Sequence, residues 1–175
     1  LILAHASVRP IENVFIWGRD FEKAKKIASV LENETFSIKP IKTIEEKISE
    51  VDIISSATLS QTPLILGKHL KRGQHIDLVG AYKKDMREAD DETIIKTSVF
   101  LDTYQGGLKE SGDIVIPLKN GSLKESEIKA DLFELCSGRK KGRNNPKEIT
   151  LFKSVGHALE DLVAANYYYN QFINE

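Results

Sequence analysis

The stretch VDIISSATLSQTPLILGKHLKRGQHIDLVGA, residues 51–81, contains the pattern that decides the fold. Two apolar runs, 51–57 and 75–79, each stop at small or hydroxylated residues, and a polar turn with the run TPLILGKHL lies between them. Short runs rich in β-branched residues are typical of buried strands. Strands that alternate with segments of helical period predict a parallel sheet with helices on both of its faces.

The same alternation continues on both sides of this stretch. Upstream, NVFIW (13–17) is predicted to be a buried strand that Gly18 ends, Asp20 caps a helix, and FSIKPI (36–41) is a weaker strand. Thr43 to Glu46 forms a capping box for a short helix. Downstream, a helix is expected near 86–96 and a strand at SVFLDT, 98–103. The apolar face of the first capped helix is predicted to be Phe21, Ala24, Ile27, Ala28 and Leu31.

The last third of the chain has a looser pattern. GDIVIPLKNG (112–121) is predicted to be a short extended segment, and a capping box from Ser122 to Glu125 is predicted to open a helix that Gly138 ends. On that helix Ile128, Leu132 and Leu135 face inward, with Cys136 as a small core residue. After a loop at 138–146, EITLFKS (148–154) is a further strand. The final helix carries Ala158, Leu159, Leu162, Val163 and Tyr169, and no strand follows it, so we expect it to lie outside the sheet.

Composition excludes several classes of protein. The 175 residues, 41% hydrophobic and 29% charged, are typical of one soluble globular domain, and the net charge of -1 gives no general attraction to nucleic acid or anionic lipid. The basic run at 138–143 has no interleaved aromatic residues and is predicted to be a solvated loop. Four scattered histidines and one cysteine predict no metal site, and no apolar run is long enough for a membrane helix. The single cysteine fits a reducing compartment, so we expect a cytoplasmic protein.

A ligand of such a sheet is expected beyond the carboxyl ends of its strands. These ends are Gly18–Arg19, Ala57–Thr58, Gly80–Ala81 and Asp102–Thr103. A dinucleotide site also needs a Gly-rich turn about 20 residues before the end of the second strand. The sequence has no such turn there, and LILAHASV resembles the last turns of a helix, so we expect the first strand and the turn to precede Leu1 in a longer protein.

The stretch WGRD (17–20) bears on the choice of cofactor. An acidic residue at this strand end would bind the ribose 2′-hydroxyl and repel a 2′-phosphate, but the position holds Gly18, followed by Arg19. A planar guanidinium can pair with a phosphate and stack on adenine, so the sequence favours NADPH over NADH. The alternative is a solvent-facing Arg19 that pairs with Asp20 or Glu22.

These residues resemble a known family, the ornithine cyclodeaminase/mu-crystallin family. The resemblance runs through VFIWGRDFEKAKKIA, residues 52–91, GGLKESGDI and EITLFKSVGHALEDLVAA. It implies a Rossmann-type, doubly wound parallel sheet that binds NAD or NADP, with a partial cofactor domain at 1–153 and a C-terminal helix at 154–175 that returns toward a missing domain. That missing part would hold the Gly-rich turn, the substrate-gripping basic residues and the sheet through which the protein forms a homodimer.

Tyr82 marks a departure from part of this family. The cyclodeaminases have an aspartate at the corresponding position, which acts on the substrate amine, whereas a phenol with a pKa of about 10 has no charge to offer an ammonium group. The sequence instead looks like the imine-reducing branch, in which DMRE (85–88) is a common continuation. The implied reaction is reduction of Δ1-pyrroline-2-carboxylate or Δ1-piperideine-2-carboxylate, both cyclic imino acids, to L-proline or L-pipecolate.

The resemblance also implies roles for single residues. Tyr82 and Glu110 are the expected catalytic residues, with water as the alternative proton donor to Glu110 and simple packing as the alternative role of Tyr82. Val155 is expected to meet the substrate. The expected cofactor-binding residues are Gly18, Arg19, Ala57, Thr58, Leu78, Val79 and Ser154. Other members of the family leave three alternatives open: ornithine cyclodeaminase, alanine dehydrogenase and a non-catalytic binding protein similar to mu-crystallin.

Overall fold

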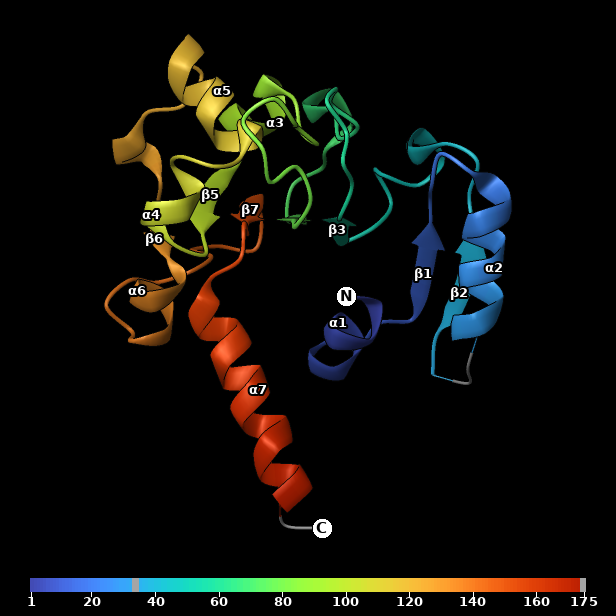
Figure 1. Cartoon of the computed structure of the whole chain (residues 1–175). Coiled ribbons are helices and arrows are strands. Elements are labelled where there is room, and N and C mark those ends of the chain that lie inside the picture. The colour runs from blue at the N-terminus through green and yellow to red at the C-terminus, as the bar shows by residue number, and fades with distance from the viewer. Residues whose placement is uncertain (33–34, 174–175) are drawn as a thin grey trace. The chain divides into compact units, whose positions relative to one another are not determined.

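The computed structural model describes residues 1–32 and 35–173, and the chain divides into two compact units, Leu1–Val51 and Asp52–Glu175 (Figure 1). The predicted division of the chain between residues 153 and 154 stays a prediction.

The first unit is a parallel pair of strands with a helix against it. Val14 of the first strand lies opposite Ile38 of the second, and the helix turns Ala24 and Ala28 into the interior. The helix begins after Asp20, whose carboxylate accepts hydrogen bonds from the Glu22 and Lys23 amides at 3.0 and 3.2 Å. The strands and the cap confirm the prediction for this region. The elements are α1 (Ile2–Val8), β1 (Asn13–Ile16), α2 (Phe21–Leu31), β2 (Ser37–Pro40) and η1 (Ile44–Glu46), a 3₁₀ turn that carries the predicted capping box.

The second unit contains a five-stranded sheet in which every neighbouring pair of strands is parallel. The last strand in the sequence lies in the middle of this sheet, between β4 and β5. The buried side chains of Ile76, Leu78, Val99, Leu101 and Leu151 form its core. The order of the strands is β3 (Ile53–Ser56), β4 (His75–Leu78), β7 (Thr150–Lys153), β5 (Ser98–Leu101) and β6 (Ala130–Asp131).

Helices and 3₁₀ turns connect these strands, as the alternating pattern predicts. Every residue of the last helix, α7, is exposed, and Figure 1 shows it running away from the sheet. The parallel α/β sheet and the helix outside it confirm the predicted fold class. The connecting elements are η2 (Gly67–His69), α3 (Asp91–Lys96), α4 (Tyr104–Gly107), α5 (Gly112–Asn120), η3 (Glu125–Glu127), α6 (Leu132–Cys136) and α7 (Ala158–Ile173).

The prediction of an extended segment at 112–121 is wrong, because this segment is the helix α5. Ser111 caps the helix by accepting a hydrogen bond from the Asp113 amide at 3.2 Å, and Gly121 ends it in the left-handed conformation at φ 84°. The β-branched run and Pro117 suggest an extended chain, yet both are buried in α5 by contacts that a local pattern does not contain.

The single helix predicted from Ser122 to Gly138 is also wrong. The segment is divided among η3, β6 and α6, because Ala130 pairs with Phe100 of β5 and Asp131 then caps a new helix with Glu134. This helix is only five residues long, so Cys136 at its end is exposed rather than in the core.

The helix expected near 86–96 is shorter than predicted and begins at Asp91. Ala89, before it, pairs with Ile65 in an isolated parallel bridge, which keeps the chain extended at that point. Asp90 then caps the helix by accepting a hydrogen bond from the Thr93 amide at 2.7 Å.

The close approach of η2 to α3 generates a test of this packing. A β-carbon at Gly67 would lie 2.5 Å from the Glu92 carbonyl carbon and 2.6 Å from the Thr93 nitrogen. We expect Gly67→Ala to lower the free energy of unfolding by about 1–3 kcal/mol, since a backbone cannot move aside as a flexible side chain can. Gly142→Ala, which meets nothing within 4 Å, is the control in the same denaturant titration. Equal stabilities of the two variants would contradict the packing.

Candidate functional site

The carboxyl ends of β3, β4 and β7 lie side by side at one edge of the sheet in the second unit. The Val79 amide donates to the Ser56 carbonyl at 2.8 Å, and the Ser154 amide donates to the Leu78 carbonyl at 3.0 Å. A third bond joins Asp102 to β7, from the Asp102 amide to the Lys153 carbonyl at 3.1 Å. The predicted residues Ala57, Thr58, Leu78, Val79, Ser154 and Val155 are thereby brought to this carboxyl edge.

A buried carboxylate, Asp102, fixes the turn that follows β7. Its Oδ2 accepts hydrogen bonds from the Val155 amide at 2.6 Å, the Gly156 amide at 2.8 Å and the Ser154 hydroxyl at 3.2 Å. Because one oxygen binds three donors from consecutive residues, the backbone of this turn has little freedom. Sequence reasoning places Asp102 at a strand end but misses this role, although an acidic residue directly after the apolar run SVFL is a signal for it.

A second buried carboxylate, Glu88, fixes the end of β3. Its Oε1 accepts hydrogen bonds from the Thr58 amide and from the Ser56 hydroxyl, both at 2.6 Å. Gly80 packs against the same group: a β-carbon there would lie 2.6 Å from Glu88 Oε1 and would collide with the Thr58 backbone. Glycine at position 80 is therefore required by the close approach of the two strand ends.

Lys153 and Asp113 form a fully buried ion pair beneath the carboxyl edge. Lys153 Nζ lies 3.5 Å from Asp113 Oδ2 and also donates a hydrogen bond to the Gly80 carbonyl. Asp113 accepts hydrogen bonds from the Glu88 and Ala89 amides at 2.7 and 3.1 Å. Burial lowers the pKa of the Lys153 ammonium and raises the pKa of the Asp113 carboxyl, and the attraction between the two groups opposes both shifts.

Sequence reasoning misses this ion pair entirely. A lysine is rarely buried without a partner, and its partner Asp113 is 40 positions away in a segment predicted to be extended. The available signal is the position of Lys153 at the end of the apolar run ITLF, where a strand buried on both faces places its side chain inside the protein.

Tyr82 lies on a loop that leaves the carboxyl edge after Gly80. Ala81 is buried in the left-handed conformation at φ 48°, and the Ser111 hydroxyl donates to its carbonyl oxygen at 2.7 Å. The Tyr82 side chain is 48% exposed, and the Lys83 ammonium lies 5.9 Å from the centre of its ring. The ring is thus outside the core of the unit, and its expected role in the reaction stays a prediction.

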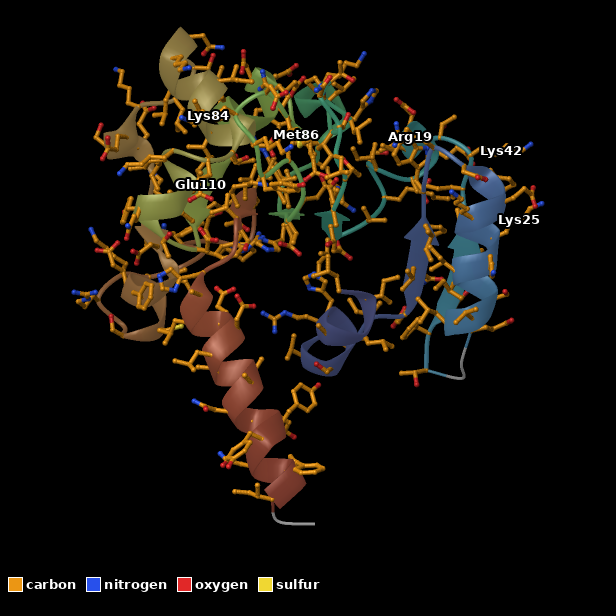
Figure 2. All side chains as sticks on the ribbon, viewed as in Figure 1. Arg19, Lys25, Lys42, Lys84, Met86 and Glu110 are labelled. Atoms are coloured by element: carbon orange, nitrogen blue, oxygen red, sulfur yellow. The ribbon has the colours of Figure 1, made fainter. Side chains whose placement is uncertain are left out.

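Glu110 and Val155 meet around Gly106 in the helix α4. A β-carbon at Gly106 would lie 2.8 Å from Val155 Cγ2 and 3.7 Å from Glu110 Oε1. Glu110 is exposed, and Figure 2 shows it near α4. Because α4 begins directly after β5 and Thr103, the predicted catalytic carboxylate and the predicted substrate residue lie at the same edge of the sheet.

The first unit presents Gly18 and Arg19 directly after β1. Arg19 is exposed and has no ion pair or hydrogen bond from its side chain among residues 1–32 and 35–173. The alternative pairing with Asp20 or Glu22 is wrong, because Asp20 lies 4.0 Å from Lys23 and Glu22 lies 2.9 Å from Lys25. Figure 2 shows the exposed Arg19 and Lys42 side chains near the ends of the two strands of this unit.

The polar groups of the carboxyl edge suit an organic cofactor better than a metal ion. They are backbone amides, carbonyls and hydroxyls, and the two carboxylates already accept several hydrogen bonds each. In the part of the chain that the structure describes, no three histidine, cysteine or acidic side chains gather as metal ligands. No described helix is long and apolar enough to cross a membrane.

A hollow of about 810 Å³ lies at the opposite edge of the sheet, where β5 and β7 begin. Its lining includes Arg72, Ser98, Lys129, Lys147 and Ile149, and it shares no residue with the carboxyl edge. The rule that ligands bind beyond the carboxyl ends of parallel strands favours the carboxyl edge over this hollow.

Comparison with known proteins agrees with this arrangement. An uncharacterised protein of Schizosaccharomyces pombe is 49% identical over 97% of this chain and 54% of its own length. A Δ1-pyrroline-2-carboxylate reductase of Colwellia psychrerythraea is 37% identical over 95% of this chain and 53% of its own. The solved structure of Δ1-pyrroline-2-carboxylate reductase from Thermococcus litoralis, in complex with NADH and L-proline, matches with a TM-score of 0.95 and 38% identity, covering 99% of this chain and 54% of that one.

The chain therefore spans about half the length of the curated relatives that it matches. The sequence profile of one family matches all of its residues, 1–175. Together with the relatives above 30% identity, this match confirms the expected family: the chain belongs to the ornithine cyclodeaminase/mu-crystallin family.

Proposed function

We propose that the complete protein reduces a cyclic ketimine, Δ1-pyrroline-2-carboxylate or Δ1-piperideine-2-carboxylate, to L-proline or L-pipecolate. The observation that carries this proposal is the likeness, along 99% of the chain, to a reductase whose structure contains NADH and L-proline. The nicotinamide cofactor, when bound, supplies a hydride to the carbon of the C=N bond. The remaining tasks fall to the protein: binding, orientation, exclusion of water and control of one proton.

The carboxyl edge of the second unit is the surface that fits the cofactor. Ala57 and Thr58, which directly follow β3, have small side chains, and the backbone of Leu78 and Val79 lies beside them at the end of β4. Ser154 presents a hydroxyl on a turn that Asp102 keeps rigid. Such a preformed surface orients a ligand without the entropic cost of ordering a loop on binding.

Tyr82 and Glu110 have separate roles at the substrate. A cyclic ketimine carries no primary ammonium group, so the hydroxyl of Tyr82 suffices where the cyclodeaminases use a carboxylate. The substrate nitrogen gains one proton as the carbon gains the hydride, and that proton comes from Glu110 or from water. The exposed Glu110 carboxylate near Val155 is well placed to exchange protons with solvent between turnovers.

The unpaired guanidinium of Arg19 supports a preference for NADPH over NADH. Gly18 leaves no carboxylate at the end of β1 to repel a 2′-phosphate, and Arg19 retains all its hydrogen-bond donors. The relative from Thermococcus litoralis contains NADH, so the preference is a property that we propose for this chain alone.

Two further expectations belong to this proposal. We propose a homodimer for the complete protein, as the family resemblance implies. A cytoplasmic location is likewise proposed, because the lone Cys136 is exposed as a free thiol, which a reducing compartment protects.

The reaction is tested with the complete polypeptide that contains these 175 residues. We expect that Δ1-pyrroline-2-carboxylate and NADPH are consumed in equal amounts with formation of L-proline, which absorbance and amino-acid analysis measure together. Saturable binding of cofactor and imino acid without turnover would contradict the proposal and favour the mu-crystallin type of binding protein. Proline formed from ornithine would favour a cyclodeaminase.

The cofactor preference is tested with Arg19→Ala. We expect the KM for NADPH to rise about tenfold or more while the KM for NADH changes less than about twofold, because one charge-assisted bond to the phosphate is lost. Lys26→Ala, which removes an exposed cation from α2, is the matched control. Equal losses for both cofactors would mean that Arg19 does not bind the phosphate.

The role of the Asp102 carboxylate is tested with Asp102→Asn. An amide replaces one acceptor oxygen by an NH₂ group, which cannot accept from the three donors at Ser154, Val155 and Gly156. We expect kcat/KM to fall about 10- to 100-fold, the range for a displaced positioning group. Asp52→Asn, at an exposed site, is the control. An unchanged kcat/KM would show that the geometry of this turn does not matter for the reaction.

A further inference from the structure

Three charged side chains from distant parts of the second unit are fully buried beneath the carboxyl edge. Lys153 comes from β7, Asp113 from α5 and Glu88 from the segment before α3. Lys153 forms an ion pair with Asp113, and Asp113 accepts a hydrogen bond from the Glu88 amide. The proposed reaction uses none of the three directly, because none reaches the solvent-accessible surface.

Lys153 continues the hydrogen bonding of the sheet at the point where the backbone ladder stops. The last ladder bond between β4 and β7 runs from the Ser154 amide to the Leu78 carbonyl at 3.0 Å. Two residues further along, the Gly80 carbonyl receives its hydrogen bond from the Lys153 ammonium instead of a backbone amide of β7. A side chain therefore fixes the direction in which the chain leaves β4.

The position of Gly80 determines two neighbouring groups at the candidate site. Its backbone lies against Thr58 so closely that no β-carbon fits. The next residue, Ala81, donates its amide to the Thr58 carbonyl at 2.8 Å and holds a left-handed conformation, from which Tyr82 projects. A shift of the Gly80 carbonyl would therefore move both the Thr58 backbone and the start of the Tyr82 loop.

Stability alone does not explain charged groups at this depth. Replacing a buried ion pair by apolar residues of similar volume is often neutral or stabilising. Glu88 Oε2 and Asp113 Oδ2 even have no hydrogen-bond donor among the described residues. Besides the ion pair with Asp113, Lys153 makes a directed N–H bond to the Gly80 carbonyl, which an apolar side chain of the same length cannot make.

We propose that Lys153 is a positioning residue, whose ammonium group fixes the Gly80 carbonyl and so keeps the Thr58 and Ala81 backbone in the geometry that binds the nicotinamide cofactor. The inference rests on the proposed function, because it concerns the same carboxyl edge. Lys153 does not touch the ligand, and no strand-end motif predicts its positioning role.

The test compares Asp113→Asn with the double variant K153M/D113N in the complete protein. Both variants lack the Asp113 carboxylate and differ only in the side chain at position 153, so their comparison isolates the amino group of Lys153. Asp113→Asn leaves that group without its buried partner, whereas K153M/D113N contains neither charge of the pair. The affinity for NADPH is measured by fluorescence titration without imino acid, and folding is checked by thermal unfolding. Lys140→Met, in the exposed loop at 138–146, is the matched control.

We expect K153M/D113N to bind NADPH about tenfold more weakly than Asp113→Asn, the factor that one lost hydrogen bond of ordinary strength produces. K153Q/D113N restores a neutral N–H donor and is expected to recover part of that loss, which a purely structural role would not predict. Affinities within about twofold for Asp113→Asn and K153M/D113N would overturn the inference while leaving the proposed function intact.

Two other outcomes are equally decisive. Should K153M/D113N fail to fold, Lys153→Arg takes its place, because a longer planar guanidinium cannot put its N–H groups where the ammonium lies. Unchanged NADPH affinity in a folded Lys153→Arg variant would overturn the inference. A wild-type protein that binds no nicotinamide nucleotide at all would overturn the proposed function and the inference together.

Discussion

The insertion of β7 between β4 and β5 is the constraint on which the rest of the second unit depends. It brings the last strand of the chain next to two strands formed 50 to 75 residues earlier, as the pairings of His75 and Ser98 with Thr150 show. The Ser154–Val155 turn is thereby placed beside Leu78 on one side and Asp102 on the other. Without this crossover the parallel strand ends could not form a single edge.

Buried charges then fix what the backbone ladder leaves open. Asp102 binds the turn after β7, Glu88 binds the end of β3, and Lys153 binds the end of β4. Each of these groups binds backbone atoms of a strand end as well as one side chain, so the position of the backbone at the edge depends little on its exposed residues. The loop that leaves this edge after Gly80 can therefore vary in sequence without moving the strand ends, and in this chain it carries the exposed Tyr82.

The elements that are predicted correctly are those that the local sequence determines by itself. The strands at 53–56, 75–78 and 98–101 follow from β-branched apolar runs, and the start of α2 follows from the cap at Asp20. The errors occur where tertiary contacts decide: Pro117 and its β-branched neighbours form a buried helix, and β6 interrupts a helical pattern to pair with β5. Cys136 is exposed for the same reason, since it is the last residue of a helix that is only five residues long.

The candidate site also contains residues whose position local patterns predict and residues that only tertiary contacts bring together. The position of Thr58, Val79 and Ser154 at the carboxyl edge could be predicted from strand ends and family resemblance, because it depends on the pattern of one segment each. The network of Glu88, Asp113 and Lys153 could not, because it exists only after α5, β4 and β7 have packed together. A charged residue next to an apolar run is the only trace that such a network leaves in the sequence.

A crystal structure of the complete protein with NADPH would test the central claim most directly, namely that the carboxyl edge of the sheet holds the cofactor. We expect the nicotinamide ring at the turn of Ser154 and Val155, within reach of Thr58. A nucleotide bound instead in the hollow at the opposite edge, among Arg72, Lys129 and Lys147, would contradict it.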